Sequence, residues 1–102
     1  MLTTWPAFSE AMHLLGRIGG WPMQRSLWQY VVESALVFYT LTTADQLRMR
    51  ALMEQYHDRP MDTADASLVA AAEATGESRI FSIDRDFYIY QRHGSEPFEV
   101  VP

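Results

Sequence analysis

The chain has 102 residues, a formal net charge of −5, and a composition that is 48% hydrophobic and 21% charged. This length excludes two domains, and the supply of apolar residues excludes a disordered chain. The absence of cysteine excludes disulfides, thiolate metal sites and a cysteine nucleophile. We therefore interpret residues 1–102 as one globular domain.

The sequence contains no segment that would direct the chain to a membrane. Its N-terminus lacks a basic region followed by an apolar run, so we expect no signal peptide. Its apolar stretches are shorter than the roughly 20 residues of a membrane helix. We expect a soluble, cytoplasmic protein without a membrane partner. The negative net charge also disfavours binding of nucleic acid through a basic surface.

The first part of the chain predicts a strand, two helices and a second strand. Leu2–Trp5 is short and β-prone, and Pro6 suits the first turn of a helix. Gly19–Gly20 ends that helix, and Pro22 opens the next one. Ala35–Leu41 is an apolar run bounded by polar residues, which predicts a buried strand.

Two further helices are expected in the second half. Thr43 and Gln46 have the spacing of a capping box and predict a helix that stops before Pro60. Asp62 is a suitable N-cap for an alanine-rich helix that ends at Gly76.

Two strands complete the prediction. The segment Arg79–Asp84 predicts a buried strand, and Phe98–Val101 predicts a short last one. Strands that alternate with helices indicate the α/β class, with a parallel sheet flanked by helices.

Three acidic residues fall at the expected carboxyl ends of strands, or on the helices that begin there. They are Glu10, Asp65 and Asp84. Parallel sheets place their sites at this edge. Carboxylates that face one another repel, so they need a cation or raised pKa values. Oxygen ligands of this kind select Mg²⁺ or Mn²⁺, which serve in phosphodiester hydrolysis.

Each acid also has a structural interpretation. Asp62 is better explained as an N-cap than as a ligand. Asp65 could serve only the helix dipole, and Asp84 could be a turn residue. Glu10 could be a solvated side chain. Local spacing alone leaves these alternatives open.

A resemblance to a known family extends over most of the sequence. The segment YHDRPMDTADASLVAAAEATGESRIFSIDRDF resembles the second half of PIN domains, particularly VapC-like toxin ribonucleases. That family has a D-x-x-D-A-x-x-V/I-A helix start, then a strand ending in T-x-D, then D-F. TTWPAFSEAMHLL resembles its earlier strand-to-helix segment, and FEVVP resembles its last strand. The matching residues of the long segment are Asp62, Asp65, Ala66, Ser82, Asp84, Asp86 and Phe87.

The resemblance implies a PIN-like parallel sheet, a cluster of acids that binds one or two Mg²⁺ or Mn²⁺ ions, and endoribonuclease activity on RNA. Carried over by position, Glu10, Asp65 and Asp84 would be the metal ligands and catalytic residues. Many VapC-like members form homodimers and are neutralised by a cognate antitoxin. The resemblance therefore also implies these two kinds of protein partner.

Further residues would lie beside the ligands. Asp62 and Asp86 would be adjacent acids, and Asp86 is an alternative to Asp84 as the primary ligand. Ser82 stands where the family often has threonine and would hydrogen-bond a ligand carboxylate. Arg85 either contacts the RNA phosphate or pairs with an acid.

The chain departs from the family pattern in one respect. PIN domains begin with a strand that ends in aspartate, and this sequence has no counterpart of it. In the family that strand lies in the middle of the sheet and supplies a central metal ligand. We therefore expect a sheet without its central strand and an incomplete metal site. Exposed sheet edges pair with other chains, so we also expect a homodimer or strand-exchanged oligomer.

The sequence thus supports two functional hypotheses. The first is a PIN-type, metal-dependent endoribonuclease that hydrolyses RNA phosphodiesters by metal-activated water. The second is an inactive remnant of that fold, which dimerises or binds an antitoxin. Three tryptophans, at positions 5, 21 and 28, could stack RNA bases, but their spacing favours packing in the core or in a dimer.

Overall fold

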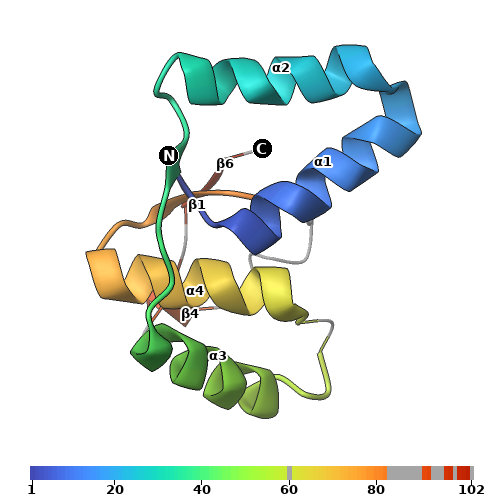
Figure 1. Ribbon diagram of the computed structural model, residues 1–102. Coiled ribbons are helices and arrows are strands. Elements are labelled where there is room, and N and C mark those ends of the chain that lie inside the picture. Colours follow the sequence, from blue (N-terminus) through green and yellow to red (C-terminus); the bar gives the residue numbers. More distant parts are fainter. Residues whose placement is uncertain (60, 83–90, 93–95, 98, 102) are drawn as a thin grey trace.

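The computed structural model describes residues 1–59, 61–82, 91–92, 96–97 and 99–101. Helices lie on both sides of a small central sheet (Figure 1). The order of helices along the described residues is the one that the sequence predicts. The helices are α1 (Trp5–Gly19), α2 (Trp21–Val32), α3 (Thr43–Gln55) and α4 (Thr63–Thr75).

The central sheet contains four short parallel strands in the spatial order β2-β1-β3-β6. The parallel pairing confirms the α/β class. Strands β4 and β5 form a separate antiparallel pair that we did not predict. The strands are β1 (Leu2–Thr3), β2 (Val37–Phe38), β3 (Arg79–Phe81), β4 (Gln91–Arg92), β5 (Glu96–Pro97) and β6 (Glu99–Val101).

The helix ends have identifiable chemical causes. The Thr4 hydroxyl accepts a hydrogen bond from the backbone N–H of Ala7, and this caps α1. Gly20 ends α1 with φ of 69°, and Gly76 ends α4 in the left-handed conformation with φ of 75°. Glycine tolerates these angles because it has no Cβ. The predicted stops at the two glycines are confirmed, as is Asp62 as the N-cap of α4.

The capping box that opens α3 differs from the predicted pair. Thr42 and Asp45 form it, one residue before Thr43 and Gln46. The Thr42 hydroxyl accepts from the Asp45 N–H at 3.1 Å, and Asp45 Oδ2 accepts from the Thr42 N–H at 2.8 Å. The prediction was wrong because we searched for Glu or Gln at the third helical position, where aspartate reaches equally well.

The predicted strand over Ala35–Leu41 is wrong in length and in burial. Only β2, two residues long, pairs with the sheet. Val37 is 55% exposed, whereas Leu36 is buried. The reason is topological: among the described residues, β2 lies at an edge of the sheet and pairs with β1 alone. A buried strand would need neighbours on both sides or cover on both faces.

The sheet separates two hydrophobic clusters. Ile80 and Phe81 are consecutive in β3, so their side chains point to opposite faces. Ile80 packs with α3 and α4, whereas Phe81 packs with residues of α1 and α2. Figure 1 shows this arrangement, with α1 and α2 above the strands and α4 and α3 below them.

Helix α4 is the most deeply buried of the described helices. It contacts α1, α3, β1 and β3, and nine consecutive residues from Ala64 to Ala72 are buried. Alanine occupies five of these positions, so neighbouring elements approach the helix backbone closely. The polar residues of this stretch, Asp65 and Ser67, must therefore find partners inside the protein.

The link between α2 and β2 contains a strained residue. Ser34 has φ of 58°, in the left-handed region, where a Cβ costs about 1 kcal/mol. We expect Ser34→Gly to stabilise the protein by up to about 1 kcal/mol in urea unfolding. The matched control is Ser26→Gly, the same change inside α2, which should destabilise because glycine disfavours helix interiors. Destabilisation by both variants would contradict this account.

The acid dependence of stability should report on Asp45. Burial raises the pKa of a carboxyl, but hydrogen bonds from the Thr42 N–H and the Tyr39 hydroxyl hold the pKa of Asp45 below its usual 3.8. A carboxyl whose pKa is lower in the folded than in the unfolded protein stabilises the fold at pH values above the unfolded-state pKa. This contribution is lost as the pH falls through the folded-state pKa. We expect Asp45→Asn to be less stable than the wild type at pH 7. The difference in free energy of unfolding between the two proteins, measured in urea, should become smaller below about pH 3.8. A difference that does not change with pH would contradict the lowered pKa of Asp45.

Candidate functional site

Glu10, Asp65 and Ser82 line one small pocket, although they come from distant parts of the sequence. The cavity has a volume of about 20 Å³, enough for one water-sized ligand. Glu10 is half-buried, whereas Asp65 is 3% and Ser82 8% exposed. The other lining residues are apolar: Ala7, Ala11, Ala64, Leu68 and Phe81.

The strand register brings two walls of the pocket to the same level. Leu2 of β1 pairs with Ile80 of β3 in parallel. Thr4 and Ser82, each two residues after this pair and directly after its strand, therefore lie together at the carboxyl edge of the sheet. Helix α1, which carries Glu10, begins directly after Thr4. This placement agrees with the expectation that parallel strands gather functional residues at this edge.

Helix geometry brings Glu10 and Asp65 to the pocket. Ala7, Glu10 and Ala11 are spaced three and four residues apart, so they share one face of α1. Ala64 and Asp65 supply the facing wall from the first turn of α4. Both carboxylate residues line the pocket beside the short side chains of these alanines.

The Asp65 carboxylate is held by a capping box. Its Oδ2 accepts a hydrogen bond from the Asp62 N–H at 3.1 Å, and Asp62 Oδ1 accepts from the Asp65 N–H at 2.9 Å. These bonds fix the orientation of Asp65 at the helix start. A carboxylate has about four lone-pair sites on two oxygens, so the capping bond to Oδ2 does not by itself exclude a role as a cation ligand. A role of Asp65 in capping α4 is thus compatible with a role as a metal ligand.

A buried hydroxyl pair connects the two helices that carry the carboxylates. Thr4 Oγ1 and Ser67 Oγ are hydrogen-bonded, and both residues are 0% exposed. Neither residue was selected from the sequence. Thr4 could have been found, because a threonine before Trp-Pro has the pattern of an N-cap followed by proline in the first turn. Ser67 carries no such local signal, since its partner is 63 residues away.

The chemistry of the pocket suits a hard cation. Glu10, Asp65 and Ser82 offer only oxygen atoms, the donors that Mg²⁺ and Mn²⁺ prefer, and two carboxylates supply negative charge. Within the described ranges, no group of three or more His, Cys, Asp and Glu residues converges on one point. The described part of the site is therefore two carboxylates and a hydroxyl.

The other predicted site residues divide into two groups. Asp84, Arg85 and Asp86 lie outside the described residues, so their roles remain predictions. Asp62 is exposed, and its contribution is the backbone N–H that holds Asp65.

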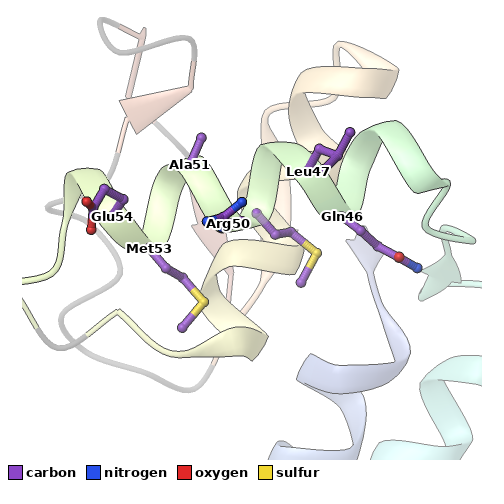
Figure 2. A pocket seen from close by; sticks show the side chains of 7 residues that line it. Gln46, Leu47, Arg50, Ala51, Met53 and Glu54 are labelled. Carbon is purple, nitrogen blue, oxygen red and sulfur yellow. The ribbon is translucent and has the colours of Figure 1, made fainter.

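A larger hollow of about 790 Å³ runs along α3 (Figure 2). Its described lining comes from that single helix and includes Met53, Glu54 and Arg50. It contains none of the predicted site residues, and its polar side chains, Gln46, Arg50 and Glu54, all come from α3. We therefore place the candidate site in the smaller pocket, where three elements meet.

Comparisons with protein families and with curated proteins found no match. The family interpretation therefore remains a prediction from the sequence motif. In the part of the chain that the structure describes, no helix is long and apolar enough to cross a membrane.

The capping box makes a prediction about Asp65 that is independent of function. Asp65→Ala removes the acceptor for the Asp62 N–H and should destabilise the protein by about 1 kcal/mol. Asp65→Asn keeps an oxygen acceptor at the same position and should be much closer to the wild type. Thermal and urea unfolding of both variants measure this difference. Equal losses would show that the carboxylate contributes to stability in another way.

Proposed function

We propose that the chain is a PIN-type, metal-dependent endoribonuclease in which Glu10, Asp65 and Asp84 hold Mg²⁺ or Mn²⁺. The observation that carries the proposal is the shared pocket of Glu10, Asp65 and Ser82. The motif resemblance selects these residues from the sequence alone, and the fold then gathers them. Residues of α1, α4 and the position after β3 that had no common role would not be expected to line one cavity.

The protein groups have distinct roles in this proposal. Glu10 and Asp65 supply the negative charge that retains a cation beside the RNA phosphodiester, and Asp84 or Asp86 would complete the set. Ser82 would donate a hydrogen bond to a ligand carboxylate, and Arg85 would contact the phosphate. A bound Mg²⁺ or Mn²⁺ activates water and neutralises the charge that develops on the phosphate. The cation also explains how a protein of net charge −5 would accept RNA.

The test is RNA cleavage by the purified chain with Mn²⁺ or Mg²⁺ and with excess EDTA. We expect cleavage that requires the metal, and a loss of at least about tenfold in Glu10→Gln and in Asp65→Asn. Glu54→Gln is the matched control, since it removes the same charge from the exposed face of α3. Activity in EDTA, or equal activity in all four proteins, would contradict the proposal.

A second function is favoured by a different observation. Large apolar side chains are exposed around α2: Ile18 is 74%, Trp21 57% and Val32 73% exposed. Such a surface is typical of an interface. The alternative is therefore an inactive PIN remnant that forms a homodimer or strand-exchanged oligomer, or that binds an antitoxin. Because Trp21 is 57% exposed, it does not pack in the core, and packing in a dimer remains the prediction for it.

Light scattering tests the oligomer directly. We expect a dimer or larger species, and dissociation in Val32→Glu, because the new charge would be desolvated at an apolar interface. The control is Glu33→Gln, beside it in sequence and exposed. A monomeric wild-type protein would rule out the oligomer, and an oligomer without metal-dependent cleavage would favour the inactive remnant.

A further inference from the structure

We infer that the buried hydrogen bond between Thr4 and Ser67 positions the two carboxylates of the pocket for the cation. This inference rests on the proposed metal site at Glu10 and Asp65. It assigns Thr4 and Ser67 as positioning residues, which act through the helices that they join.

The number of hydroxyl protons defines which residue is the donor in the Thr4–Ser67 hydrogen bond. A serine hydroxyl has one proton, and Ser67 Oγ donates to the Ala64 carbonyl at 2.7 Å. Ser67 Oγ must therefore accept from Thr4 Oγ1. The Thr4 oxygen in turn accepts from the Ala7 N–H. The result is a chain of three hydrogen bonds from the first turn of α1 to the first turn of α4.

Both ends of this chain are close in sequence to a carboxylate. Thr4 caps α1, and Glu10 lies within the first two turns of that helix. Ser67 is two residues after Asp65 in α4. The bond therefore sets how far the start of α1 stands from the start of α4, and with it the separation of the carboxylates.

Small side chains predominate where the two helices face each other at the pocket. They are Ala7, Ala11 and Ala64, with Leu68 as the larger exception, so few large side chains interdigitate there. The hydroxyl pair is 0% exposed, so bulk water does not compete for it. A directional bond in such surroundings costs more to break than one at the surface.

Substitutions at Ser67 and Thr4 distinguish the effect of the Thr4–Ser67 hydrogen bond from that of the α1 cap. Ser67→Ala removes the acceptor of the Thr4 proton and leaves the cap of α1 intact. Thr4→Val removes both the donor and the cap at almost constant volume, whereas Thr4→Ser keeps both. Thr75→Val is the matched control, because it removes a hydroxyl from the other end of α4, where Thr75 donates to the Ala71 carbonyl.

The experiment is Mn²⁺ binding by isothermal titration calorimetry, at a temperature where circular dichroism shows every variant to be folded. Affinity then reports the geometry of the folded state and not its stability. We expect Ser67→Ala and Thr4→Val to bind Mn²⁺ about tenfold more weakly, the loss typical of residues that orient metal ligands. Thr4→Ser and Thr75→Val should bind like the wild type.

The outcomes distinguish the two proposals. Binding by the wild type, loss in Asp65→Asn, and unchanged affinity in Ser67→Ala and Thr4→Val would refute the positioning role and leave the metal site standing. Equal weakening in Thr75→Val would also refute it, since any lost hydroxyl in α4 would then suffice. No Mn²⁺ binding by the wild type would overturn the metal site and this inference together.

Discussion

The burial of α4 is the constraint on which the rest of the structure depends. The sheet, α1 and α3 all pack against this helix, and its nine buried residues include five alanines that allow close approach. Burial of this kind leaves Asp65 with little access to bulk water and Ser67 with none. Each has a partner in the protein: the N–H of Asp62, the N-cap of the same helix, for the carboxylate, and Thr4, the N-cap of α1, for the hydroxyl. The hydroxyl of Ser67 thus connects α4 to the start of α1.

The same packing connects stability with the proposed chemistry. Asp65 is at once a member of a capping box and a wall of the pocket, so its orientation is fixed before any cation arrives. The ion pair of Arg48 with Glu73, with N–O distances of 2.7 and 3.0 Å, holds α3 against the other end of α4. The pocket is therefore built between rigid helices and the end of a strand, which favours a defined ligand geometry.

The extent to which the sequence predicted the fold differs between elements. The helices were predicted well because their signals are local: Asp62 and Gly76 bound α4 at the expected places, and Gly20 follows α1. The strand over 35–41 was predicted too long and too buried, because an apolar run does not show whether it will lie at an edge. The α3 capping box was displaced by one residue because Asp45 was not considered as its acid.

The candidate site, like the fold, could be predicted from the sequence only in part. The sequence by itself determined which carboxylates to consider, because the motif around Asp65 and the segment of Glu10 are readable one residue at a time. Only the tertiary structure decided that they face one pocket with Ser82, since this follows from the parallel register of β1 and β3. The Thr4–Ser67 bond was equally invisible in the sequence. Its two residues are 63 positions apart, and a hydrogen bond of that range depends on packing and not on local propensity.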